Sequence, residues 1–224
     1  MKKANIKEIF QSIQGEGIYV GEMQIFVRFC GCNLNCRFCD TEHNTNNSTL
    51  YTSDDLINEI NKYGKSQTIS FTGGEPLLNA DFLSEVLPVL KQQGHKIYLE
   101  TNGTLPEYLE KVIQYTDVVA ADIKLYSSAK VYPDKSKVSK FFDIAKEKET
   151  FAKVVFNSDI TDEEIEFVTD LAKSYDIEVI LQPEMTGNSF ALPVSSCEKI
   201  FRKFYSKYRK IRLIPQMHKF LSVK

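Results

Sequence analysis

Three cysteines in one short segment constrain this chain more than any other feature. Cys32, Cys36 and Cys39 follow the spacing C-x3-C-x2-C, directly after an apolar run at residues 25–30 that predicts a β-strand. Three thiolates on one loop can converge on a single metal centre, and iron–sulfur clusters are held by cysteine thiolates, usually four. Three ligands would leave one iron of a four-iron cluster open to bind another molecule.

Structural zinc is the main alternative for this loop, with Cys30 as a fourth ligand. Structural zinc sites usually pair one C-x2-C with a second, distant pair of cysteines or histidines, and the sequence contains no such second pair. We therefore expect Cys30 to be a bystander. A disulfide framework is not expected, because five cysteines is an odd number and 224 residues can bury a core without such bonds.

Length and charge exclude several classes of protein. A chain of 224 residues predicts one domain, and a net charge of −2 implies no general affinity for nucleic acid. The N-terminal residues lack the apolar core of a signal peptide, and no run approaches the 18 apolar residues of a membrane span. Clustered thiols without an export signal indicate a reducing cytoplasm.

Short β-branched runs alternate with helical segments along the chain, which predicts a parallel sheet with right-handed crossovers. Strands are expected at residues 25–29, 68–71, 96–100, 117–123, 151–156, 177–181 and 211–214. Helices are expected at residues 52–63, 81–93, 106–114, 137–148, 161–175 and 195–208, with an irregular stretch at 126–134.

Unusual polar residues follow six consecutive strands at their carboxyl ends. Barrel enzymes carry their sites at that end of the strands, whereas open sheets bind ligands in one crevice. We therefore expect an α/β fold, an incomplete (β/α) barrel of about six parallel strands.

A glycine pair ends the second predicted strand, in Thr72-Gly73-Gly74-Glu75-Pro76. Two glycines there let the backbone approach a ligand closely, and the proline fixes the turn that follows. A tight turn with a surface acid is the alternative for a glycine pair taken alone.

The cysteine motif and the glycine pair together resemble the radical S-adenosylmethionine (SAM) superfamily. The resemblance implies a barrel-like fold and a [4Fe–4S] cluster on the three cysteines, whose open iron binds the amino and carboxylate groups of SAM. An electron from the cluster then splits SAM into methionine and a 5′-deoxyadenosyl radical.

The resemblance and the strand-end positions predict a SAM-binding set. Its members are Phe38, Gly73, Gly74, Glu75, Glu100, Asn102, Lys124 and Gln182. Several members have a plainer alternative: core packing for Phe38, an Asn-Gly turn with a helix cap for residues 100–103, and a local ion pair with Asp122 for Lys124.

Three further segments, residues 14–17, 39–41 and 215–218, resemble the 7-carboxy-7-deazaguanine synthase family, and this resemblance covers nearly the whole chain. It implies a lyase that converts 6-carboxy-5,6,7,8-tetrahydropterin to 7-carboxy-7-deazaguanine and ammonia, in the biosynthesis of queuosine and other deazapurines. The radical would take the hydrogen from C6 of the substrate and return it after rearrangement, so that SAM is regenerated.

Arg28 lies in the middle of a predicted strand, where a charge is costly unless it meets an anion. A substrate carboxylate would satisfy its guanidinium, and an internal ion pair is an equal alternative. The resemblance implies a Mg²⁺ ion on Thr41, since magnesium prefers oxygen ligands. The predicted substrate-binding set is Gln14, Gly15, Glu16, Arg28, Thr72 and His218.

The resemblance also predicts organisation and partners. We expect a single domain with a substrate-binding segment at residues 1–24, a partial barrel at 25–182, and a C-terminal helix and tail at 183–224 that close the site. The expected partners are a pterin, a flavodoxin- or ferredoxin-type electron donor and a second copy of the chain, with no direct contact to nucleic acid or membrane.

Two rival functions stay open at this point. A glycyl-radical-enzyme activase shares the cysteine spacing and an Asp-x-Lys strand end, but it consumes SAM and acts on a large protein. A non-catalytic iron–sulfur or zinc protein is the other rival, and the glycine pair argues against it.

Overall fold

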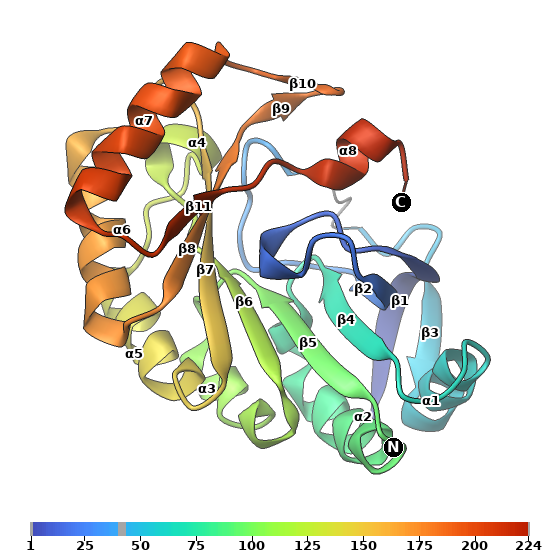
Figure 1. The fold of residues 1–224 in the computed structure, drawn as a ribbon. Coiled ribbons are helices and arrows are strands. Elements are labelled where there is room, and N and C mark those ends of the chain that lie inside the picture. The colour runs from blue at the N-terminus through green and yellow to red at the C-terminus, as the bar shows by residue number, and fades with distance from the viewer. Residues whose placement is uncertain (1, 40–43, 224) are drawn as a thin grey trace.

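The computed structural model describes residues 2–39 and 44–223, and within them nine strands form one sheet (Figure 1). The strand order is β11-β8-β7-β6-β5-β4-β2-β1-β3, and neighbours from β11 to β2 run parallel. The parallel strands are β2 (Met23–Phe29), β4 (Thr68–Gly73), β5 (Lys96–Thr101), β6 (Val118–Asp122), β7 (Glu149–Phe156), β8 (Glu178–Pro183) and β11 (Ile211–Leu213). The sheet ends in open edges, so the expected incomplete barrel is confirmed, with seven parallel strands in place of about six.

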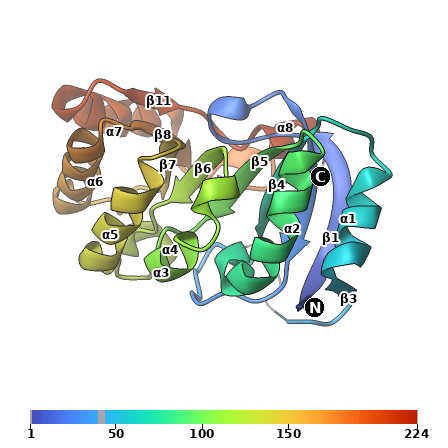
Figure 2. The same cartoon turned by 90° about the horizontal axis from the view of Figure 1, so that it is seen from below.

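Helices cover the outer side of this curved sheet, and the N-terminal turn lies on its inner side (Figure 2). The α-helices are α1 (Ser53–Asn61), α2 (Ala80–Gln92), α3 (Pro106–Leu109), α4 (Tyr126–Ala129), α5 (Lys135–Ala145), α6 (Asp162–Tyr175), α7 (Val194–Lys207) and α8 (Met217–Leu221). The 3-10 helices are η1 (Gly17–Tyr19), η2 (Pro76–Asn79) and η3 (Ile113–Tyr115). None of the helices described is long and apolar enough to cross a membrane.

Successive side chains along each strand point to opposite faces of the sheet, and apolar side chains form a core on each face. In β6, Val119 and Ala121 belong to the large apolar cluster under the helices, whereas Val118 and Ala120 belong to a smaller cluster on the inner face. Residues i and i+2 of a strand share a face, which explains this division. The inner cluster packs against Ile18 and Tyr19 of η1, so the N-terminal turn is fixed on the inner face.

Local signals explain where two of the predicted helices begin. The Thr52 side chain accepts a hydrogen bond from the Asp55 backbone at the start of α1, and the Asp55 carboxylate accepts one in return. Thr161 and Glu164 form the same reciprocal cap at the start of α6, as their spacing predicted.

The strands β1 (Lys3–Ile13) and β3 (Thr49–Thr52) were not predicted from the sequence. Strand β1 pairs antiparallel with β2 and with β3, and its register to β2 shifts between Ile6 and Glu8. This irregularity interrupts the alternation of apolar and polar residues by which strands are recognised. Two more differences are local: the stretch predicted as irregular contains α4, and the helix predicted at 106–114 divides into α3 and η3.

Candidate active site

One cavity of about 230 Å³ lies at the carboxyl ends of the parallel strands. The cysteine loop, the ends of β4 to β8, the turn after β1 and the C-terminal segment all contribute to its walls. Of the predicted site residues that the structure describes, every one except Glu75 lines this cavity: Gln14, Gly15, Glu16, Arg28, Cys32, Cys36, Phe38, Cys39, Thr72, Gly73, Gly74, Glu100, Asn102, Lys124, Gln182 and His218. Thr41, the predicted magnesium ligand, lies outside the described residues.

The three cysteines of the motif form one end of the cavity. Burial raises the pKa of the Cys36 thiol to about 11, although the Lys124 ammonium opposes this shift. The Cys32 sulfur accepts hydrogen bonds from the Leu34 backbone at 3.4 Å and from the Asn102 amide at 3.8 Å. Burial also raises the pKa of the Cys32 thiol, against these hydrogen bonds, so Cys32 and Cys36 stay protonated by themselves. A bound metal deprotonates a coordinating thiol.

The arrangement suits a cluster better than a single ion. Among the described residues, no three His, Cys, Asp or Glu side chains lie close enough to hold one metal ion. In an iron–sulfur cluster the thiolates bind different irons, so they stand further apart than the ligands of one ion. Cys30 is buried and does not line the cavity, so the structure does not assemble the four-cysteine zinc site.

The glycine pair after β4 packs against the start of the cysteine loop. The Gly74 backbone donates to the Phe29 carbonyl at 3.0 Å, and the Glu75 backbone donates to the Gly31 carbonyl at 2.8 Å. A Cβ on Gly74 would lie 1.8 Å from the Gly31 oxygen, which no side chain can occupy. The pair therefore lets two backbones meet at the cavity wall and leaves room there for a ligand.

Glu75 is the predicted SAM contact that the structure keeps out of the cavity. Its carboxylate is fully buried and accepts hydrogen bonds from the Leu77 backbone, the Asn102 backbone and the Thr101 hydroxyl, at 2.8–3.0 Å. Burial raises its pKa to about 7, against these three hydrogen bonds. In this arrangement the side chain ties β5 to η2 instead of facing the cavity.

Gln182 supplies the clearest sign that a ligand belongs in this cavity. The residue is only 1% exposed, yet neither its amide nitrogen nor its amide oxygen has a hydrogen-bond partner. Buried polar groups nearly always have hydrogen-bond partners, so an unpaired buried amide that lines a cavity indicates that a ligand supplies its hydrogen bonds. Asp122 presents a second unpaired oxygen nearby, while its other oxygen binds Lys124 at 2.7 Å. The local ion pair predicted as the alternative for Lys124 is therefore present.

The opposite end of the cavity is built from the turn after β1 and the chain end. The backbone N–H of Met217 donates to the Gly15 carbonyl at 2.8 Å, and the Gln216 amide donates to the Glu16 carboxylate at 2.7 Å. A Cβ on Gly15 would lie 2.6 Å from His218. Figure 1 shows α8 beside this turn. The hydrogen bond between Gln216 and Glu16 thus joins residues 200 positions apart in the chain.

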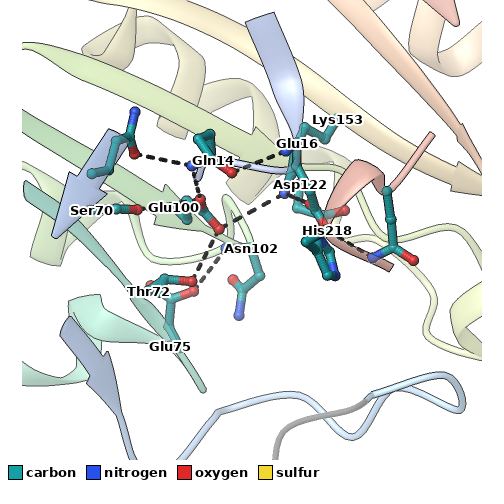
Figure 3. A network of polar contacts seen from close by, with 12 residues as sticks. Gln14, Glu16, Ser70, Thr72, Glu75, Glu100, Asn102, Asp122, Lys153 and His218 are labelled. Atoms are coloured by element: carbon teal, nitrogen blue, oxygen red, sulfur yellow. Dashed lines mark hydrogen bonds and ion pairs between the residues drawn. The ribbon is translucent and has the colours of Figure 1, made fainter. Parts of the chain in front are cut away.

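Lys153 of β7 holds Glu16 from the other side (Figure 3). The lysine side chain is 5% exposed and forms an ion pair with Glu16. Burial alone would raise the pKa of Glu16, but the Lys153 ammonium and the hydrogen bond from Gln216 lower it to about 2. Glu16 is thus an ionised hydrogen-bond acceptor inside the cavity across the physiological pH range.

Glu100 lies at the centre of the polar network in Figure 3. Its carboxylate accepts hydrogen bonds from the Gln14 amide at 3.0 Å, the Ser70 hydroxyl at 3.3 Å and the Thr72 hydroxyl at 3.0 Å. Lys153 lies 3.9 Å away. Glu100 was predicted to bind SAM, but these partners join it to the residues predicted to bind the substrate.

Of the two alternatives that the sequence left open for Arg28, the structure shows the internal ion pair. The Arg28 guanidinium binds the Glu8 carboxylate at 3.0 Å and lies 5.4 Å from the centroid of the Phe10 ring. The side chain also lines the cavity. A guanidinium has five N–H donors, so the ion pair with Glu8 leaves donors for a second carboxylate.

Sequence reasoning missed Lys153 and Gln216 as cavity residues. Lys153 stands in the apolar strand Phe151–Phe156, and the argument that singled out Arg28 would have found it as well. Gln216 was part of a noticed segment, but nothing in the sequence shows that it reaches Glu16.

Comparisons with known proteins agree with this geometry. The model of the Radical SAM superfamily matches residues 26–179. A 7-carboxy-7-deazaguanine synthase of Archaeoglobus fulgidus is 35% identical, over 99% of this chain and 100% of the relative. Relatives of the same name are 33% identical in Methanocaldococcus jannaschii, over 97% and 99% of the two chains, and 32% identical in Geobacter sulfurreducens, over 97% of each.

Solved structures show a similar fold. The crystal structure of QueE from Escherichia coli superposes with a TM-score of 0.70 at 23% identity, over 96% of this chain and 95% of that one. A structure of TYW1 with a lysine-pyruvate adduct bound gives a TM-score of 0.60 at 16% identity, over 82% and 73% of the two chains. At these identities the likeness concerns the fold alone.

Proposed function

This chain belongs to the radical SAM superfamily and, within it, to the family of 7-carboxy-7-deazaguanine synthases, and we propose from that premise that it converts 6-carboxy-5,6,7,8-tetrahydropterin to 7-carboxy-7-deazaguanine and ammonia. The observation that carries the proposal is a cavity that has three cysteines at one end and an ionised polar cluster at the other. Such a lyase serves the biosynthesis of queuosine and related deazapurines.

The cysteine end would hold the [4Fe–4S] cluster and SAM. The cluster would be bound by Cys32, Cys36 and Cys39, and SAM would lie against the backbone of Gly73 and Gly74 and the side chains of Phe38, Asn102, Lys124 and Gln182. When bound, the two cofactors supply a carbon radical that can remove a hydrogen atom from a C–H bond of the substrate. The unpaired amide of Gln182 would gain its hydrogen bonds from SAM.

The opposite end would hold the pterin. Its ring presents several N–H donors, which suit the carboxylates of Glu16 and Glu100 as acceptors. Lys153 keeps Glu16 ionised and in place, and Gln14 and His218 complete this end of the cavity. Arg28 would bind the 6-carboxylate and so fix which carbon of the ring faces the cysteines.

Four finer features belong to the same proposal. A Mg²⁺ ion would join Thr41 to the substrate carboxylate, because magnesium prefers oxygen ligands and keeps open positions. The working form would be a homodimer in the cytoplasm, and a flavodoxin- or ferredoxin-type protein would supply the electron. All five cysteines being free fits a reducing compartment.

The identity of the substrate is tested in anaerobic assays followed by mass spectrometry. These assays compare 6-carboxytetrahydropterin with a tetrahydropterin that lacks the carboxylate. We expect a deazapurine product from the carboxylated substrate alone. Arg28→Met should lower kcat/KM by about 10- to 100-fold, the range for a lost hydrogen bond to a charged group. Arg202→Met, which breaks an exposed ion pair with Glu198, is the matched control. An unchanged kcat/KM in Arg28→Met would remove this residue from the substrate site, and absence of any deazapurine would refute the function.

A further inference from the structure

A basic and aromatic surface borders the outer side of the cysteine loop. It comes from α4, the segment after it and the first turn of α5, and we call it the lysine–tyrosine surface; it consists of Tyr126, Lys130, Tyr132, Lys135 and Lys137. The two tyrosine rings stack on each other in the open, with centroids 4.2 Å apart, and Tyr132 is 77% exposed. Lys130 lies over the Tyr126 ring at 5.0 Å.

The charge of this surface departs from that of the whole chain. The protein carries a net charge of −2, but residues 130–140 contain four lysines and one acid, Asp134. The Asp134 carboxylate accepts from the backbone of Ser136 and Lys137 and so serves as a helix cap. No described carboxylate forms an ion pair with these four lysines, whereas Lys203 and Lys207 of α7 are both paired with acids of α6.

Direct contacts connect the lysine–tyrosine surface to the cysteine loop. Arg37, which lies between two cysteines of the motif, donates from its backbone to the Ala129 carbonyl at 2.9 Å. Its side chain donates to the Ser128 carbonyl at 3.1 Å. A second cavity, also of about 230 Å³, separates Asn33 and Leu34 of the loop from Tyr132 and Lys137. The lysine–tyrosine surface therefore adjoins the loop that would hold the cluster, where the Arg37 guanidinium is itself paired with Glu184.

We propose that the lysine–tyrosine surface is the docking site of the protein that reduces the cluster, an acidic one-electron carrier with a flavin or an iron–sulfur centre. The proposal rests on the proposed function, in which the cluster needs one electron from outside the chain. That electron leaves the reduced carrier and enters the cluster, and no proton or group moves with it. Positive charge beside the cluster loop steers an acidic partner and orients it.

The composition of the surface fits a transient complex, and electron-transfer encounters bury small interfaces. Tyrosine is enriched at protein interfaces because its ring gives contact area at low entropic cost. Figure 1 shows α4 at the same edge of the sheet as the carboxyl ends of the strands, the edge where the cysteine loop lies.

The test is a pair of charge-reversal variants with equal changes in net charge. Lys130→Glu/Lys137→Glu alters the docking surface, and Lys65→Glu/Lys146→Glu alters the loops that precede β4 and β7, at the opposite edge of the sheet. Cluster reduction is followed by stopped-flow absorbance on reconstituted protein, once with dithionite and once with flavodoxin kept reduced by its reductase. This readout needs no pterin, so it is independent of the proposed reaction.

At low ionic strength, we expect flavodoxin to reduce the cluster of the docking-surface variant at least about tenfold more slowly than that of the wild type. This difference in rate should shrink at high salt. Dithionite should reduce all three proteins at the same rate. In Lys130→Gln/Lys137→Gln, the rate of reduction by flavodoxin should fall less than in the charge-reversal variant.

Three results would overturn the proposal. An unchanged rate with flavodoxin would place docking elsewhere, and an equal loss with dithionite would place the effect in the cluster itself. A wild-type protein that accepts electrons from dithionite but from neither reduced flavodoxin nor reduced ferredoxin would exclude this class of partner. If instead the wild-type cluster is reduced by both donors but no deazapurine forms, the proposed function fails and the docking result stands.

Discussion

Two buried carboxyl groups in this protein have opposite electrostatic environments. Lys153 and Gln216 lower the pKa of Glu16 from 4.5 to about 2, against its burial. For Glu75, burial outweighs three hydrogen bonds and raises the pKa from 4.5 to about 7. Ionisation of Glu16 therefore stabilises the fold, whereas ionisation of Glu75 costs stability as the pH rises from about 4.5 to 7.

Glu16→Gln should lower the free energy of unfolding by about 3 kcal/mol at pH 7, the scale for breaking a buried ion pair. Because the native pKa is about 2 and the ordinary value is 4.5, the contribution of Glu16 is complete above pH 4.5 and disappears as the pH falls towards 2. Urea unfolding of wild-type and variant protein between pH 7 and 3 measures this. The two curves should converge in acid, and a constant difference would contradict the assignment. Exposed Glu107→Gln controls for the lost charge.

Gly74→Ala should prevent cluster loading, because its Cβ would fall 1.8 Å from the Gly31 oxygen and push the cysteine loop away from β4. Iron content after reconstitution is the measurement. Gly21→Ala is the control: its φ of +94° strains any alanine, but no atom lies within 4 Å of the added Cβ. Normal iron content in Gly74→Ala would show that the two backbones can separate without cost to the site.

Single residues were predictable wherever their chemistry was conspicuous in the sequence. The cysteines and the glycine pair stood out by spacing, and Arg28 stood out as a charge inside a strand. The orientation of Glu75 could not be predicted, because it depends on hydrogen bonds to Leu77 and Asn102 that only the folded chain brings together.

At the scale of elements, two segments that are 200 residues apart in the chain meet to close the cavity. The turn after β1 and the segment leading into α8 share the hydrogen bond between Met217 and Gly15 and the contact between Gln216 and Glu16. Phe220 of α8 packs edge-on against Phe190 of the β9 (Met185–Thr186) and β10 (Ser189–Phe190) hairpin, with ring centroids 5.8 Å apart. The pterin end of the site therefore depends on the position of α8.

Gly15→Ala should displace α8 and leave the cysteine end intact, since the added Cβ would lie 2.6 Å from His218. We expect KM for the pterin to rise at least about tenfold, the equivalent of 1.4 kcal/mol, with unchanged iron content and SAM affinity. Gly187→Ala, in the open turn between β9 and β10, serves for comparison. Equal KM values in both variants would show that α8 does not shape the substrate site.

The sequence predicted the βα alternation well because each of those strands is a continuous apolar run followed by a capped helix. Strand β1 was missed because its register shift near Ile6 breaks the alternation of apolar and polar residues, and because it contains charged residues. Helix α8 was missed because it is five residues long and contains no buried residue. Its position comes from contacts with the N-terminal turn, which no local pattern encodes.

At the scale of the whole molecule, the fold and the metal site are separable. The apolar core under the helices is continuous from β1 to β11 and contains none of the three motif cysteines, which lie on a loop at the edge of the sheet. Removing iron with a chelator should therefore abolish SAM binding while thermal unfolding stays cooperative. Circular dichroism and calorimetry of apo and reconstituted protein measure this, and loss of the cooperative transition in the apo protein would contradict it.

We propose that one cavity brings SAM and the pterin together so that SAM acts as a catalyst. The most direct measurement is an anaerobic assay of the reconstituted protein with dithionite, SAM, Mg²⁺ and 6-carboxytetrahydropterin, in which both product and SAM are quantified by mass spectrometry. We expect 7-carboxy-7-deazaguanine in excess of any SAM consumed. Accumulation of 5′-deoxyadenosine and methionine without a deazapurine would contradict it and would favour an activase that consumes SAM.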